Sequence, residues 1–219
     1  QYGRIEANSA EGAEIGISIA RGTQHSTIQN NTVYNASGIG VEIADARFCS
    51  IVGNTVDGNS STDTGIVVDG TNVDAQGCAV SGNTVRNVTA QGIHAIAGAP
   101  YLTITGNHVT VAGASAFGIR VQNSDDVRVA GNTVDGSTTS ETCLHISNSS
   151  RVGVSANNLR RSANFAIQVV GDAAAVTGVV ISPDNILQGT NGRIQSVEVN
   201  GGTVQVDAGD EVNSPAALV

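Results

Sequence analysis

Short runs of alternating hydrophobic and polar residues recur along the chain, and Gly, Asn or Ser interrupts them. Around Asn54, the run CSIV precedes the asparagine, TVD follows it, and GIVV comes after a variable segment. Val, Ile and Thr with a period of two predict short β-strands that bury one face and turn the other outward. Three such strands in each unit predict an all-β chain.

Each unit carries the same marker, an asparagine followed two positions later by Val or Leu. It recurs every 23 to 29 residues, at Asn31, Asn54, Asn83, Asn107, Asn132, Asn157 and Asn185. A unit of about 25 residues cannot bury its inward face alone, so the units must stack as coils of a solenoid. We therefore expect a single-stranded parallel β-helix with three parallel sheets and about eight coils, spaced about 4.8 Å apart. We assign the asparagines to the bends between strands, where Asn tolerates the left-handed backbone conformation.

The phrase G-N-T-V followed by G-I-x-V resembles a known family of repeats over residues 16–196. It is similar to the right-handed β-helix repeats of pectate-lyase-like enzymes, mannuronan C5-epimerases, NosD-like periplasmic proteins and phage tail spikes. The resemblance implies a carbohydrate ligand and a secreted, extracellular, periplasmic or virion-surface location. In the pectate-lyase-like enzymes the strand after the variable loop carries the active site, and the substrates are uronate polysaccharides.

The two ends of the chain depart from the repeat. Residues 1–15 fit no complete coil, and we expect the remnant of a cap or a link to an upstream domain. Residues 16–196 form the β-helix. Residues 197–219 read as a hairpin around Asn200 followed by a tail, and the hairpin would cover the open edge of the last coil. A poorly capped solenoid end predicts a larger protein or a homo-oligomer.

Composition narrows the possible partners. Of 219 residues 40% are hydrophobic but only 3% aromatic, so Val, Ile, Leu and Ala must build the core. The net charge is −9, and all ten basic residues are Arg. This balance argues against nucleic acid, which needs basic patches, and against an anionic membrane surface. No apolar run is long enough to span a bilayer.

The three cysteines fit the repeat. Cys49 and Cys78 both stand five residues before a marker asparagine, so we expect them to be inward neighbours in adjacent coils. Cys143 takes the place that Gly holds in other units. We expect three buried free thiols, because parallel side chains give poor disulfide geometry and no Cys-x-x-Cys motif occurs.

The G-I-x-V strands carry an unusual outward column. Alternation points Ile66 and Val68 inward and Val67 outward. The equivalent outward positions of successive units are Ser18, Glu42, Val67, His94, Arg120, His145 and Gln168. A scaffold face would carry Thr, Ser, Val or Asn, whereas three consecutive coils here hold His, Arg and His. The strand spacing puts Arg120 about 5 Å from each histidine.

These three residue types suit chemistry on an acidic sugar. Arg120 can pair with a uronate carboxylate and stabilise the charge that develops when the neighbouring proton leaves. His94 or His145 can take that proton near neutral pH. A second group then protonates the leaving oxygen, giving β-elimination, or returns a proton to the carbon, giving C5-epimerisation. We take His94, Arg120 and His145 as candidate catalytic residues.

Polar residues on the same strands and at the following bends could rim the site. The candidates for substrate binding are Glu42, Asp45, Asp69, Asn123, Asn148 and Gln168. Oxygen-rich bends can also hold a hard cation, so Ca²⁺ is a possible cofactor. Its candidate ligands are Asp69, Asp74, Asn123, Asp125 and Asp126.

Two other functions remain open. A glycoside hydrolase or depolymerase would use Glu42, Asp45 and Asp69, with carboxyl groups about 5 to 9.5 Å apart. A non-catalytic spike, adhesin or carbohydrate-binding scaffold would need none of this chemistry. In that case His94, Arg120 and His145 would share one strand face by chance.

Overall fold

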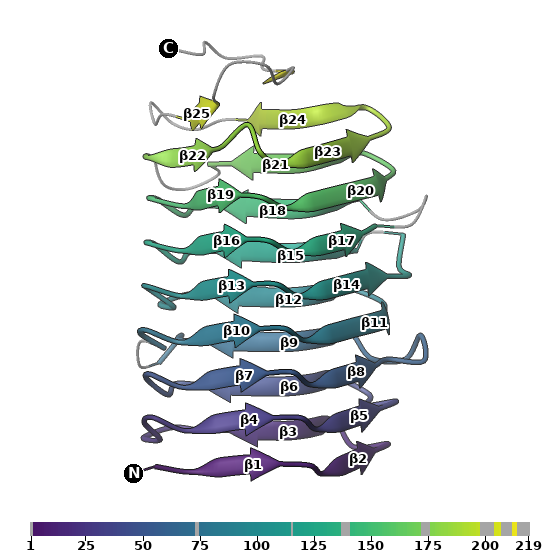
Figure 1. The fold of residues 1–219 in the computed structure, drawn as a ribbon, viewed down its shortest axis with the longest axis vertical. Coiled ribbons are helices and arrows are strands. Elements are labelled where there is room, and N and C mark those ends of the chain that lie inside the picture. Colours follow the sequence, from purple (N-terminus) through teal and green to yellow (C-terminus); the bar gives the residue numbers. More distant parts are fainter. Residues whose placement is uncertain are drawn as a thin grey trace.

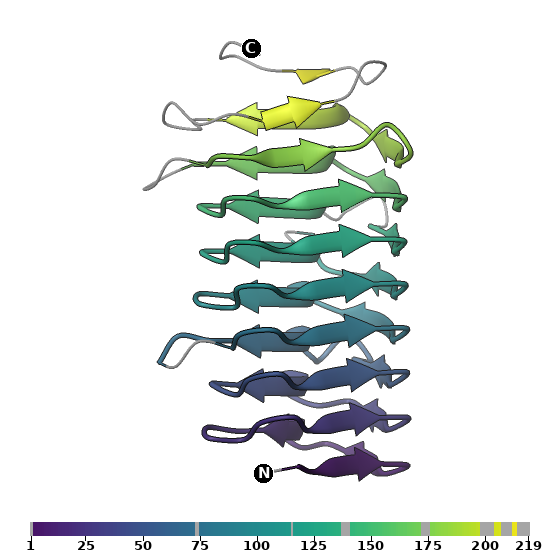
Figure 2. The same ribbon diagram turned by 60° about the vertical axis from the view of Figure 1, so that its left-hand side comes forward.

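The computed structural model describes residues 2–72, 75–114, 116–136, 141–171, 176–197, 204–206 and 212–213. These residues form strands and no helix, and the strands wind into a stack of coils that runs from the first described strand to the last (Figures 1 and 2). Within the described ranges there is accordingly no helix able to cross a bilayer. The prediction of an all-β parallel β-helix is confirmed.

Three parallel sheets of nine, eight and nine strands make up the described stack. The first sheet contains β1 (Arg4–Glu6), β4 (Thr27–Gln29), β7 (Ser50–Val52), β10 (Ala79–Ser81), β13 (Thr103–Thr105), β16 (Arg128–Ala130), β19 (Gly153–Ser155), β22 (Val179–Ile181) and β25 (Val204–Val206). The second sheet contains β2 (Ser9–Glu11), β5 (Thr32–Tyr34), β8 (Thr55–Asp57), β11 (Thr84–Val88), β14 (His108–Val111), β17 (Thr133–Asp135), β20 (Asn158–Ser162) and β23 (Ile186–Gly189). The third sheet contains β3 (Ile15–Ile19), β6 (Ile39–Ala44), β9 (Thr64–Asp69), β12 (Gln91–Ile96), β15 (Phe117–Gln122), β18 (Thr142–Ser147), β21 (Phe165–Val170), β24 (Gly192–Val197) and β26 (Val212–Asn213).

The core lies inside the coils and consists of stacked aliphatic columns. In the first sheet Ile51 pairs with Val80 and Val80 with Ile104, and all three are fully buried. Cys49 and Cys78 directly precede paired residues of β7 and β10, so they are neighbours as expected. Both are buried and free, as is Cys143.

A ladder of asparagine side chains joins the coils. From Asn31 onward, the Oδ1 atom of each member accepts the backbone N–H of the preceding member at 2.8 to 3.0 Å. Each Nδ2 up to Asn157 donates to the next Oδ1, and each from Asn31 onward also donates to a carbonyl of the preceding coil. The ladder consists of Asn8, Asn31, Asn54, Asn83, Asn107, Asn132, Asn157 and Asn185. It therefore includes the seven markers and an eighth member, Asn8, that the sequence pattern missed.

The sharp bend lies one residue earlier than expected. The marker asparagines do not have positive φ; the residue before them does at every marker except Asn185, for example Asn30 (φ 54°), Gly53 (φ 64°) and Gly82 (φ 63°). The ladder needs both the backbone N–H and the side chain of the marker inside the coil. The left-handed turn therefore falls on the preceding residue, where glycine is the least strained choice.

Both ends of the chain differ from expectation. Residues assigned to a cap remnant or linker form β1 and β2, which pair in parallel with β4 and β5 and complete a first coil. The expected C-terminal hairpin is wrong, because β24 and β25 lie in different sheets. β25 pairs in parallel with β22, and β26 pairs in parallel with β24. An alternating pattern is the same in a hairpin and in a further coil, and here the strands pair with the exposed edges of the preceding coil. The turn predicted at Asn200 lies outside the described residues.

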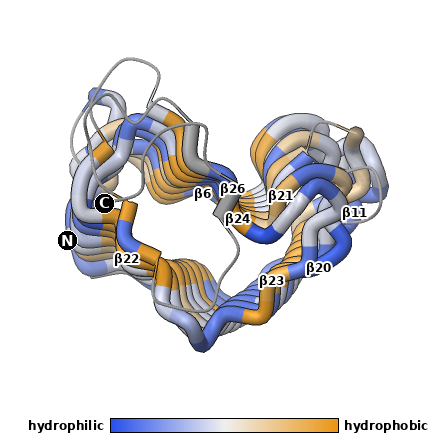
Figure 3. The backbone as a smooth tube through the Cα atoms, turned by 90° about the horizontal axis from the view of Figure 1, so that it is seen from above, coloured by the Kyte–Doolittle hydropathy of each residue, from blue (hydrophilic) through white to orange (hydrophobic). Residues whose placement is uncertain are grey.

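Seen along the axis, the outline of the coils is indented at the third sheet (Figure 3). The outer face of β6, β21 and β24 lies in this indentation. All six residues of β18 and the four central residues of β12 are buried, so these strands are covered on their inner and outer faces. In the short strands of the first sheet, such as β4, only the inward-facing residue is fully buried. The third sheet therefore presents a sheltered outer face.

Candidate functional site

The outer face of the third sheet carries the expected column of side chains. His94 on β12 pairs with Arg120 on β15, and Arg120 pairs with His145 on β18. The neighbouring residues Ile93 and Ile119 point the other way into the core. The column continues through Val67, Glu42 and Ser18 toward the N-terminus and through Gln168 and Gln195 toward the C-terminus. The register predicted from alternation is confirmed.

The two histidines are more sheltered than an ordinary outward residue. His94 and His145 are each only 8% exposed, and Arg120 between them is partly buried. Tight packing inside the coil holds β12 in place, because a Cβ on Gly92 would lie 2.2 Å from the Cγ1 of Val109. Only glycine fits this close approach, which fixes the strand that presents His94.

Two further residues complete the site. The Nε2 atom of His94 lies 3.3 Å from the Oε1 of Gln122. The ring of Phe117 packs against that of His145, with centroids 4.6 Å apart, and lies 5.2 Å from the guanidinium carbon of Arg120. Gln122 stands two positions after Arg120, so alternation could have found it. Phe117 stands three positions before Arg120, across Gly118, where the period of two is interrupted.

Burial keeps both imidazoles neutral. Together with the positive charge of Arg120, it lowers the pKa of His94 to about 4, against the opposing effect of the hydrogen bond to Gln122. Burial likewise lowers the pKa of His145 to about 4, with added repulsion from Arg120 and His94. The site thus places one guanidinium between two neutral imidazoles.

The candidate carboxylates already have protein partners. Asp45 is buried, forms an ion pair with Arg21 at 3.2 Å, and accepts hydrogen bonds from the backbone and side chain of Asn72. Asp69 accepts hydrogen bonds from the backbone N–H and hydroxyl of Thr71. Glu42 accepts a hydrogen bond from Ser18 at 2.9 Å. Asp45 and Asp69 thus stabilise turns, and Glu42 bonds along its own column.

The amide candidates lie in two settings. Asn123 and Asn148 take positive φ values of 50° and 48° at the bends that follow β15 and β18. Gln168 lies in the column itself, one coil beyond His145, and donates a hydrogen bond to Gln195 at 2.8 Å. Gln168 is therefore placed beside the histidines, whereas the two asparagines lie at the ends of the strands.

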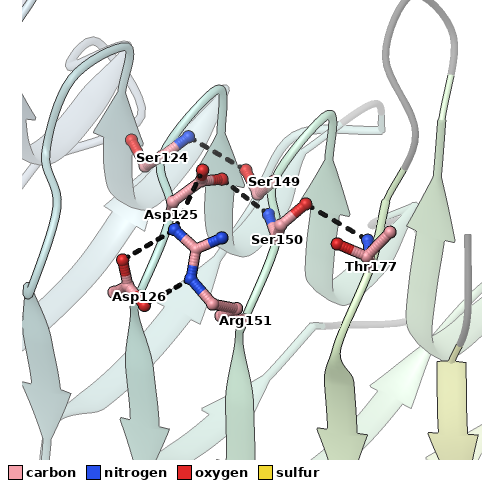
Figure 4. A network of polar contacts seen from close by, with 7 residues as sticks. All are labelled: Ser124, Asp125, Asp126, Ser149, Ser150, Arg151 and Thr177. Atoms are coloured by element: carbon pink, nitrogen blue, oxygen red, sulfur yellow. Dashed lines mark hydrogen bonds and ion pairs between the residues drawn. The ribbon is translucent and has the colours of Figure 1, made fainter.

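The calcium hypothesis finds no support in the described part of the chain. Arg151 binds Asp126 at 2.6 Å through Nε and Asp125 at 3.3 Å through Nη2 (Figure 4). Asp125 also accepts the backbone N–H of Ser150. These contacts compensate both carboxylates, and Asp74 lies outside the described residues. Among the residues that the structure places, no three His, Cys, Asp or Glu side chains form a metal-binding group.

Solved structures with a similar fold include an alginate epimerase, a glucanase and a tailspike protein. A periplasmic alginate epimerase, AlgG, superposes with a TM-score of 0.82 at 13% identity, over 98% of this chain and 51% of that one. The catalytic unit of a GH87 α-1,3-glucanase from Streptomyces thermodiastaticus gives 0.60 at 12%, over 97% and 48%. The Dettilon tailspike protein gives 0.57 at 14%, over 97% and 54%. This chain therefore spans about half the length of each, and at such identities the likeness is one of fold.

No protein with a curated description shows significant sequence similarity to this chain. The family model of the right handed beta helix region, in contrast, matches residues 1–80 and 64–209. Those two ranges cover nearly the whole described stack of coils. The chain belongs to the right-handed β-helix family.

Proposed function

We propose that the outer face of the third sheet binds an acidic, uronate-containing polysaccharide and removes the C5 proton of one sugar. The observation that carries the proposal is the register of His94, Arg120 and His145 on three adjacent strands. The reaction ends either in β-elimination or in C5-epimerisation.

Arg120 is the carboxylate-binding residue in this proposal. A guanidinium offers two parallel N–H donors to a carboxylate, and its electrostatic attraction to the carboxylate is stronger in a sheltered site than in water. Removing the C5 proton places negative charge on the carboxyl group, and a bound guanidinium stabilises that charge as it forms. Phe117 beside the guanidinium restricts its movement.

The histidines are the proton carriers. A base must be unprotonated before the reaction, and the low pKa values of His94 and His145 meet this condition at neutral pH. A uronate bound to Arg120 would bring a negative charge beside each imidazole. That charge would raise the pKa of both histidines toward neutrality and make them stronger bases.

The comparisons support a carbohydrate substrate. Three structures that share the fold are an alginate epimerase, a glucanase and a tailspike. We extend this likeness to a location where polysaccharides occur, in the periplasm, outside the cell or on a virion. Gln168, Asn123 and Asn148 are proposed to contact sugars on either side of the reacting one.

The other two functions have less support. A hydrolase would need a pair of available carboxylates, whereas Asp45 and Asp69 are bound within turns. A purely binding surface would not require two buried histidines around one arginine, since burying a titratable group costs free energy.

The test uses alginate, pectate and glycosaminoglycans as substrates. Ultraviolet absorbance detects the unsaturated product of elimination, and proton NMR measures the ratio of C5 epimers. The wild type should act on at least one substrate, and Arg120→Gln should lose activity at least a hundredfold. His108→Gln, a change of an exposed histidine on the second sheet, is the matched control and should keep wild-type activity. Binding without turnover by the wild type would refute the enzymatic proposal.

A further inference from the structure

Exposed aromatic side chains line the edge at which the coils enter the first sheet. Tyr2, His25, Phe48 and Tyr101 each stand two residues before a strand of that sheet, so they hold the same place in their coils. The chain has only three Tyr and three Phe, and half of these six residues stand at this one place. Tyr2, Phe48 and Tyr101 are 82%, 46% and 59% exposed, and His25 is exposed as well. These rings are therefore available to a ligand.

The first three rings form one continuous stack. The ring centroids of Tyr2 and His25 lie 5.3 Å apart with an interplanar angle of 26°, and those of His25 and Phe48 lie 5.1 Å apart at 11°. Rings in full face-to-face contact would have centroids about 3.5 to 4.0 Å apart. The three rings are therefore offset, and part of each face stays uncovered. Gly77 holds the next place, where a Cβ would lie 2.8 Å from Cδ1 of Phe48, so the missing side chain leaves room for the Phe48 ring.

The backbone at this place is unfavourable for side chains of this size. His25, Phe48 and Tyr101 have φ values of 52°, 54° and 57°, in the left-handed region. Gly77 has a φ of 66° at the equivalent place, and glycine or asparagine adopts this conformation at less cost than an aromatic residue. Strained residues of this kind are concentrated at ligand-binding sites. Their side chains are exposed here, so the strain is not offset by burial in the core.

A polar hollow of about 180 Å³ adjoins the stack. Its lining includes Arg21, Thr23, Gln24, Asp45 and Arg47. Gln24 and Arg47 directly precede two of the stacked rings, and their backbones form a parallel bridge between adjacent coils. Two arginines and one aspartate leave one positive charge in excess. The hollow thus offers hydroxyl, amide, guanidinium and carboxylate groups beside uncovered ring faces.

We infer that the stack of Tyr2, His25 and Phe48 and the adjoining hollow form a saccharide-binding site, separate from the column of the third sheet. One face of a pyranose ring presents C–H groups that pack against an aromatic face, whereas its hydroxyl groups need hydrogen-bond partners. The stack supplies the ring faces, and Thr23 and Gln24 supply polar partners. The stack follows the solenoid axis, so an extended polysaccharide can contact successive coils. The net charge of −9 disfavours nucleic acid, the other class of polymer that stacks on aromatic rings. The inference does not depend on catalysis at the third sheet.

The test titrates the protein with trisaccharides of polymannuronate, polygalacturonate and cellulose and follows the ring signals of His25 by NMR. In the wild type, at least one trisaccharide should shift these signals saturably. Phe48→Asn removes a ring where Asn tolerates the backbone conformation, and Tyr2→Ser removes a ring that is 82% exposed. Each change should weaken binding by about fivefold or more, whereas Phe48→Tyr should keep wild-type affinity. Tyr34→Thr, which removes a ring that is 39% exposed on the second sheet, is the matched control and should bind like wild type.

Several results would overturn the inference. It is wrong if no trisaccharide shifts the His25 signals, or if Phe48→Asn and Tyr2→Ser bind like wild type. It is also wrong if Arg120→Gln abolishes the shift, because the third sheet would then hold the ligand. Self-association in the absence of sugar that Phe48→Asn abolishes, measured by analytical ultracentrifugation, would instead make the stack a contact between two copies of the chain. Binding that requires Phe48 but leads to no turnover would support this site while refuting the enzymatic proposal.

Discussion

Removing one asparagine from the middle of the ladder should destabilise the whole solenoid. The side chain of Asn107 makes four buried hydrogen bonds: two from Asn83, one to the carbonyl of Val80, and one to Asn132. At about 1 kcal/mol each, Asn107→Ala loses about 4 kcal/mol. The change also leaves buried donors and acceptors of neighbouring coils without partners, which adds about 1 to 3 kcal/mol for each group that water cannot reach.

The matched control is Asn8→Ala at the N-terminal end of the ladder. The side chain of Asn8 makes two hydrogen bonds, to Glu6 and Asn31, at the exposed end of the stack. Its backbone N–H bond to Asn31 does not depend on the side chain. We expect a loss of at most about 1 kcal/mol, because water can replace the missing contacts.

Urea unfolding followed by far-ultraviolet circular dichroism measures both free energies. The expected order is wild type, then Asn8→Ala slightly below it, then Asn107→Ala lower by about 4 kcal/mol or more. Equal losses for the two variants would show that the ladder does not hold the coils together and that aliphatic packing alone does so.

Three further predictions concern the site and the thiols. Arg120→Lys should lower kcat/KM on the polysaccharide at least tenfold, since an ammonium cannot make the two-pronged carboxylate contact; wild-type kinetics would exclude that contact. Because the folded-state pKa values of His94 and His145 lie near 4, below the ordinary 6.5, the unfolded chain binds more protons and stability falls as pH drops from about 6.5 to about 4. At about 1.4 kcal/mol per pKa unit, replacing either histidine with Gln should make the free energy of unfolding fall by about 3 kcal/mol less over this pH range, as measured by urea unfolding. Histidine ring signals in NMR that titrate near 6.5 would contradict this prediction. Thiol titration without reductant should count three free cysteines after denaturation and slow reaction before it, because burial raises the pKa of Cys78 to about 11 and of Cys143 to about 12; a count of one would reveal a disulfide.

The sequence predicted the coils and the column well because both depend on local spacing. A period of two decides which side of a strand faces inward, and a repeated marker aligns successive strands, so Arg120 could be placed between His94 and His145 before any coordinates. The C-terminal hairpin failed for the opposite reason. Alternation is the same in an antiparallel pair and in a parallel coil, and only the partner strand distinguishes them.

The environment of the site could not be predicted in the same way. Alternation gives the direction of a side chain but not its exposure, so the burial of His94 and His145 was unexpected. Glycine at position 118 interrupts the period, so Phe117 was missed. The carboxylate of Asp45 looked available until Arg21 and Asn72 were found against it, and those contacts come from turns whose shape the pattern does not specify.

The ladder also makes the rise between successive coils independent of the number of residues in each coil. Successive markers are 23 to 29 residues apart, yet the ladder bonds stay within 2.8 to 3.0 Å. Extra residues therefore enter the connecting turns and leave the rise of the stack unchanged. A protein engineer could lengthen the turn before β12 or β15, or exchange it for that of a homologue, while the spacing of the histidines and the arginine stays fixed. The architecture thus allows new turns to be grafted around an unaltered column of His94, Arg120 and His145.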